Sequence, residues 1–123
     1  MIKIEFQTVH ELVALHRGLL EARFCEIPND PDVSGSPILS RLHREVISQI
    51  ISCESSQKAQ AWKRWLEISP SRREWSVAID RARASSVWKN STDNIKAEFA
   101  IDLLSPFETT DSLIESFICD VDR

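Results

Sequence analysis

Two amphipathic stretches joined by a loop rich in proline and aspartate constrain the fold of this chain most strongly. Thr8 and Glu11 form a Thr-x-x-Glu capping box, which is a start signal for a helix. The apolar residues of 9–24 then recur at helical spacing along one face. Ser36 and Pro37 supply an N-cap and a first-turn proline for a second amphipathic helix. The pattern therefore predicts an antiparallel pair of helices at the N-terminal end.

Four further helices are predicted by the same reasoning, and the six together fill most of the chain. The expected helices run from Thr8 to about Phe24, from Pro37 to about Glu54, from Ser55 or Ser56 to about Leu66, roughly from Pro70 to Lys89, from after Asp93 to before Pro106, and from about Thr110 to Val121. The chain has only two glycines, which disfavours an all-β fold with its many tight turns.

The N-terminal segment departs from helical spacing. Ile2, Ile4 and Phe6 alternate with charged residues, as in a short strand or an extended arm. The predicted fold class is therefore all-α: a compact bundle of about six short helices in a single domain, residues 1–123, with at most one short N-terminal β-strand.

The cysteines and the apolar segments bear on the compartment. Cys25, Cys53 and Cys119 are odd in number, widely spaced and without a CxxC motif, so we expect buried free thiols in a reducing environment. No apolar run reaches the length of a membrane span, and residues 1–6 do not resemble a signal peptide. A cytoplasmic protein that does not enter the membrane is the resulting expectation.

Charge is distributed unevenly behind the net value of −4. Residues 56–92 carry eight basic and three acidic side chains, whereas residues 93–123 carry two basic and eight acidic ones. Such asymmetry is typical either of a charged partner or of two segments that neutralise each other in the folded chain.

The three histidines are the first candidates for chemistry, because histidine titrates near neutral pH. His16 and His43 lie within the apolar stripes of the first two helices, at similar heights in the predicted hairpin. They could therefore meet as an acid–base pair or as metal ligands, but no third ligand or triad partner follows at a suitable spacing. A hydrogen-bonded core pair is the interpretation we favour. With no phosphate-binding or cofactor motif either, we expect no enzyme, no metal and no cofactor.

The four tryptophans lie in the basic middle third of the chain, where they could stack on nucleic-acid bases. Trp62, Trp65 and Trp75 share faces with apolar neighbours, so we interpret them as core residues. The helices around them also allow a helix-turn-helix interpretation using the arginines of residues 70–89. The sequence pI of about 5.4 argues against nucleic-acid binding.

Trp88 differs from the other three. In a continuous helix of residues 70–89 it aligns with Val77 and Arg81, nearly opposite the Trp75 face. That second apolar face is either sandwiched between neighbours, which is the favoured alternative, or exposed as an interface anchor that could also support a homodimer.

The last helix has an acidic face. Asp111, Glu115 and Asp122 fall within a narrow sector opposite Leu113, and Glu108 lies just upstream. Such a face is commonly only solvated, but it also provides an electrostatic attraction for a basic partner. The candidate partner-binding residues are Asp111, Glu115, Asp122, Glu108, Arg81, Trp88 and Val77.

These features favour a non-catalytic protein-binding module over an enzyme. In size, charge and composition the chain resembles the immunity proteins and antitoxins that neutralise bacterial toxins, and no motif of those proteins is matched. The resemblance implies a protein partner, such as a basic toxin domain whose positive cleft an acidic inhibitor would cover. A secretion chaperone or adaptor is one alternative, and a helix-turn-helix-like domain that binds nucleic acid through residues 70–89 is another.

Overall fold

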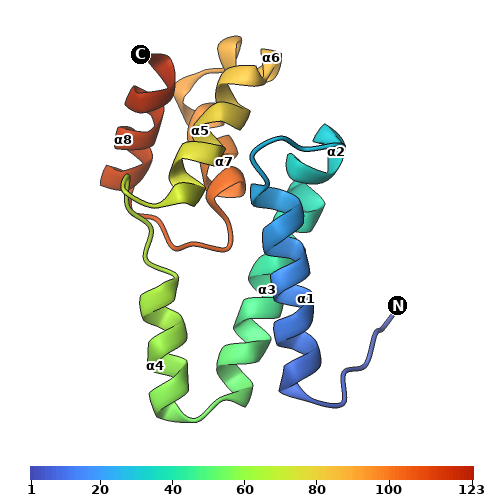
Figure 1. Cartoon of the computed structure of the whole chain (residues 1–123). Coiled ribbons are helices and arrows are strands. Elements are labelled where there is room, and N and C mark those ends of the chain that lie inside the picture. Colours follow the sequence, from blue (N-terminus) through green and yellow to red (C-terminus); the bar gives the residue numbers. More distant parts are fainter.

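The computed structural model describes all residues, 1–123, and consists of eight helices without a β-sheet (Figure 1). This confirms the predicted all-α bundle. The helices are α1 (Val9–Phe24), α2 (Pro31–Ser34), α3 (Pro37–Cys53), α4 (Ser56–Trp65), α5 (Arg73–Ala84), α6 (Ser86–Lys89), α7 (Asp93–Leu104) and α8 (Asp111–Asp122).

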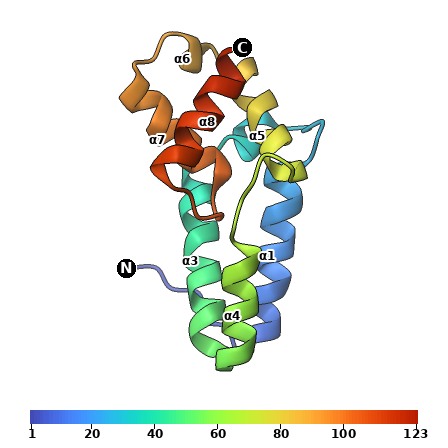
Figure 2. The same cartoon turned by 90° about the vertical axis from the view of Figure 1, so that its left-hand side faces the viewer.

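The first two long helices begin as their caps predict. Thr8 Oγ1 accepts from the backbone N–H of Glu11, and the Glu11 carboxylate accepts from the backbone N–H of Thr8, which completes the capping box. Ser36 caps α3 with Pro37 at the first helical position. α1 and α3 then pack side by side as the predicted antiparallel pair (Figures 1 and 2).

Two apolar clusters hold the bundle together. The smaller one joins α1, α3 and α4 around Ile47, Ile50 and Leu66. The larger one fills the space between α5, α7 and α8 around Trp75, Trp88 and other fully buried side chains. Figure 2 shows α4 beside the lower halves of α1 and α3, with α5 to α8 grouped at the other end of the molecule.

Two expectations about the helices need correction. The loop of residues 28–36 contains the extra short helix α2, which Asp30 caps through its side chain. The helix expected over residues 70–89 is divided into α5 and α6, because Ser85 adopts an extended conformation with φ −86° and ψ 124°. The break allows Trp88 to turn into the core, where edge-to-face contacts with Phe99 and Phe117 hold its ring.

Of the two alternatives for the N-terminal segment, the short strand does not form. Residues 1–6 are an exposed arm with which no other segment pairs. The only β-bridge joins Glu67 to Glu108, and it ties the end of α4 to the segment before α8. No helix combines the length and the apolar content that crossing a membrane requires.

The cysteines are the last correction. We expected buried thiols, but Cys53 and Cys119 are exposed and Cys25 is half-buried. Each lies at a helix end or on the outward face of a helix, away from the apolar stripe that packs inward.

Candidate functional site

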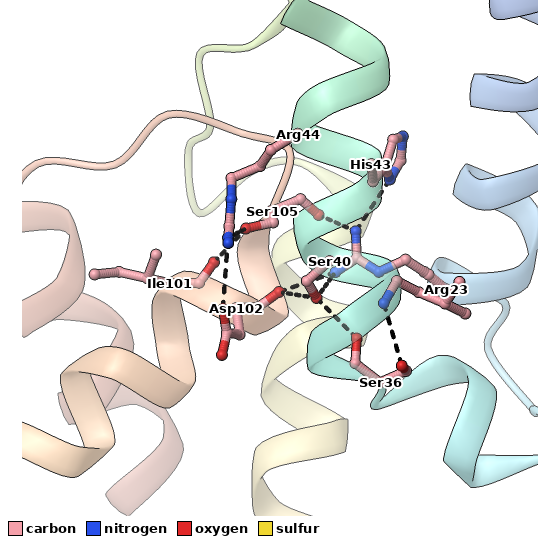
Figure 3. Close-up of polar contacts among 9 residues, drawn as sticks. Arg23, Ser36, Ser40, His43, Arg44, Ile101, Asp102 and Ser105 are labelled. Carbon is pink, nitrogen blue, oxygen red and sulfur yellow. Dashed lines mark hydrogen bonds and ion pairs between the residues drawn. The ribbon is translucent and has the colours of Figure 1, made fainter. Parts of the chain in front are cut away.

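A buried arginine joins the N-terminal hairpin to the rest of the bundle (Figure 3). The Arg23 side chain extends from α1 and is 3% exposed. Its Nη2 donates to Ser40 Oγ at 3.0 Å and to the carbonyl oxygen of Asp102 at 2.9 Å. Its Nη1 donates to the carbonyl oxygen of Ser105 and lies 3.0 Å from His43 Nδ1. The guanidinium thus binds α1 and α3 to the C-terminal end of α7.

The same arginine fixes the protons of the predicted histidine pair, which the structure brings together. His16 Nδ1 lies 2.8 Å from His43 Nε2. Because a guanidinium can only donate, His43 Nδ1 must accept from Arg23, and the proton of His43 lies on Nε2. His43 Nε2–H then donates to His16 Nδ1, so the proton of His16 lies on its own Nε2. One chain of hydrogen bonds therefore sets both tautomers.

Burial keeps both imidazoles neutral. It lowers the pKa of His43 to about 3, with further contributions from the charge of Arg23 and from His16. Burial, and then the charge of Arg17, also lowers the pKa of His16. Burial lowers the pKa of Arg23 to about 10, and nearby Arg44 adds to that effect while Asp102 opposes it. At neutral pH the group is therefore one cation and two neutral rings.

Most hydrogen-bonding groups of this cluster have partners within the chain. The Ser40 hydroxyl accepts from Arg23 and donates to the carbonyl oxygen of Asp102 at 2.8 Å, so its proton and one lone pair are engaged. No group of three or more potential ligands lies together to hold a metal ion. The pair nevertheless leaves one hydrogen-bond donor free, the Nε2–H of His16.

The predicted acidic residues separate into two kinds. Asp111, Glu115 and Glu108 are exposed and make no ion pair. Asp122 instead accepts from Trp88 Nε1 at 2.9 Å and pairs with Lys96 Nζ at 2.9 Å. The hydrogen bond from Trp88 is the largest single cause that lowers the pKa of Asp122, and the hydrogen bond and the charge of Lys96 lower it further against the opposing effect of burial. Asp122 therefore links α6 and α7 to α8, and unlike the other three carboxylates it is already paired within the chain.

A groove of about 520 Å³ lies along α8 beside the first turns of α7. Asp111 and Glu115 line it together with Asp93, a residue that the sequence analysis did not select. Asp93 is also free of ion pairs. The rest of the wall is apolar apart from one thiol, and comprises Ala97, Ile114, Ile118 and Cys119. The sequence contained one signal for Asp93. Two consecutive helices joined by a short loop pack antiparallel, which brings the first turn of the earlier helix beside the later turns of the last helix.

The Trp88 face is buried, which was the alternative that the sequence favoured. Trp88 is 2% exposed and Val77 4% exposed, so neither can serve as a surface anchor for a partner or a second copy. Arg81 donates to the carbonyl oxygens of Cys25 and Glu26, and so fastens α5 to the end of α1.

The other arginines near or within α5 are engaged in the same way. Arg73 donates to the carbonyl oxygen of Phe24 at 2.7 Å, and Arg83 donates to those of Asp120 and Val121. Arg72, just before α5, donates to the carbonyl oxygens of Trp65 and Glu67 and pairs with Glu74. These four arginines thus bind carbonyl oxygens at helix ends and turns within the chain.

Comparison of the chain with protein-family models, with curated proteins and with solved structures found no match. The geometry described above is therefore the basis for the functional argument.

Proposed function

We propose that the chain is a non-catalytic protein-binding module whose α7–α8 groove receives a basic segment of another protein. The observation that carries the proposal is the set of three carboxylates, Asp93, Asp111 and Glu115, that surround an apolar floor without any cation of their own. Apolar surface supplies affinity, and the charged rim selects a partner of opposite sign.

The chemistry of the groove indicates what would bind there. A helix or extended segment that presents apolar residues flanked by lysine or arginine would match both the floor and the rim. Residues 93–123 carry a net charge of −6, so the surrounding field would speed the encounter at low ionic strength.

Within this class we propose an inhibitor of the immunity or antitoxin type, which covers the basic cleft of a toxin domain. Size, acidity and the groove support this choice. The two exposed thiols fit a reducing compartment, so we place the encounter in the cytoplasm. The hydrogen bonds from the arginines near and within α5 to backbone carbonyls leave the nucleic-acid alternative, which uses residues 70–89, few arginine donors for phosphates.

The test is a quantitative pull-down from extracts of the source cells. The groove variant Asp93→Asn/Asp111→Asn/Glu115→Gln should capture at least about tenfold less of the partner that the wild type retains, a loss of about 1.4 kcal/mol of binding energy. The matched control is Glu5→Gln/Glu21→Gln/Glu26→Gln, which removes three exposed carboxylates elsewhere. Equal capture by all three proteins, or an equal loss in both variants, would refute the proposal.

A further inference from the structure

An open pocket between α1 and α4 lies directly against the histidine pair. Its volume is about 470 Å³, within the range of small-molecule sites. The indoles of Trp62 and Trp65 form much of its wall, and His16 lies at its base. Residues of α1 and α4 line the pocket, whereas residues of α7 and α8 line the groove. Figure 1 shows α4 at the opposite end of the molecule from α7 and α8.

The base of this pocket presents a single buried donor. His16 is 4% exposed, and its Nδ1 is occupied by His43. The hydrogen bonds from Arg23 through His43 leave the remaining proton of His16 on Nε2. Nε2 has no hydrogen-bond partner in the chain, and it is not among the nitrogens sealed from solvent. This N–H therefore reaches the space of the pocket, where an acceptor group of a ligand could replace water as its partner.

The charges around the pocket have one sign. Arg17 and Lys58 are the only charged residues that line it. Arg17 forms no ion pair, and Lys58 makes only a 4.0 Å contact with Glu54 while its side chain stays 74% exposed. A donor at the base and two cations beside it favour an anion.

We infer that this pocket binds a small aromatic carboxylate. The ring would lie against Trp62 and Trp65, as aromatic rings prefer offset or edge-to-face contacts with indoles. The carboxylate would accept from His16 Nε2–H and face Arg17 and Lys58. A monoanion suits the site better than a phosphate dianion. Arg17 and Lys58 are exposed, so solvent screens their charges, and the only donor at the buried base is single and neutral and cannot offset the desolvation of two charges.

The test uses 2-naphthoate as the probe, with uncharged 2-naphthamide of nearly the same shape as the comparison. Titration followed by calorimetry should show one site that prefers the acid by about tenfold or more. The imidazole ¹⁵N signals of His16 should shift on binding, since Nε2–H gains an acceptor. 2-Naphthyl phosphate, the dianionic arm, should bind more weakly than 2-naphthoate.

The variant Arg17→Gln/Lys58→Gln should weaken 2-naphthoate binding by about fivefold or more while the thermal transition stays unchanged, because both side chains are exposed. The matched control Lys63→Gln/Arg64→Gln removes two exposed cations of α4 that do not line the pocket. It should bind as the wild type does. The inference is overturned if the amide or the phosphate binds as tightly as the acid, if both variants lose affinity equally, or if no binding occurs at millimolar 2-naphthoate.

Discussion

Among single residues, His16 and His43 show how a polar pair can occupy an apolar interface. Burial lowers the pKa of both rings. Below pH 6.5, where an unfolded chain would protonate its histidines, the folded chain therefore favours the neutral rings. Each ring offers one donor and one acceptor, and the arginine behind them decides which nitrogen plays each part. Protonation of either ring would convert its accepting nitrogen into a donor, so this chain of hydrogen bonds requires both rings to be neutral.

A pH dependence of stability follows from this. The pKa of His43 is lowered in the folded state, so the stabilisation is complete above the unfolded value near 6.5 and is lost as pH falls toward the folded value of about 3. Between pH 7.5 and 5.5 the free energy of unfolding should fall by about 1.4 kcal/mol through His43 alone. Urea denaturation at the two pH values measures it. A free energy of unfolding that stays constant across this range would contradict the neutral pair.

Between elements, the contacts of Arg23 explain how the hairpin is joined to the C-terminal helices. The guanidinium reaches from α1 to α3 and to two carbonyl oxygens at the end of α7. No carboxylate bonds it, since the Asp102 side chain lies with Arg44 at 3.5 Å. The link is therefore a set of hydrogen bonds to neutral acceptors.

Replacing this arginine should weaken the whole bundle. Arg23→Met would leave two buried acceptors, His43 Nδ1 and the carbonyl oxygen of Ser105, without the donor that they bind, each at a cost of about 1–3 kcal/mol. We expect the free energy of unfolding to drop by about 3 kcal/mol, measured by chemical denaturation. Arg17→Met, an exposed arginine of the same helix, should change it by less than about 0.5 kcal/mol. Similar losses in the two variants would mean that the Arg23 contacts contribute nothing specific.

Most helix positions, and the meeting of the two histidines, could be predicted from periodicity and caps, because those signals are local. The Thr8 box and the Ser36–Pro37 pair begin their helices where expected. The sequence also predicted that His16 and His43 could meet, because they lie at similar distances from the loop that joins the two helices of the hairpin. The structure brings their rings together.

The break at Ser85 could not be predicted in that way. No glycine or proline marks it, and the burial of the Trp88 ring against Phe99 and Phe117 decides it. The roles of Arg23 and Asp122 were missed for the same reason. Their partners come from helices far along the chain, so only the tertiary structure shows that both charges are used internally.

Across the whole molecule, two candidate binding surfaces of opposite charge lie on different helices. The α7–α8 groove has three unpaired carboxylates, and the α1–α4 pocket has two cations and a histidine donor. An acidic groove for a basic protein segment and a basic pocket for a small anion can therefore be occupied independently. Substitutions that abolish binding at one surface should leave binding at the other surface unchanged.

Two exposed cysteines allow the proposed protein-binding role of the α7–α8 groove to be tested directly. Cys119 lines the groove, whereas Cys53 lies at the end of α3 and outside it. Alkylation by N-ethylmaleimide can be followed at each thiol by mass spectrometry, in the purified protein and after incubation with an extract of its source cells. If a partner occupies the groove, Cys119 should react at least about fivefold more slowly in the extract, and Cys53 should react at its original rate. Equal rates at Cys119 in both conditions, or slowing at Cys53 alone, would contradict the proposal that this groove is where the protein binds its partner.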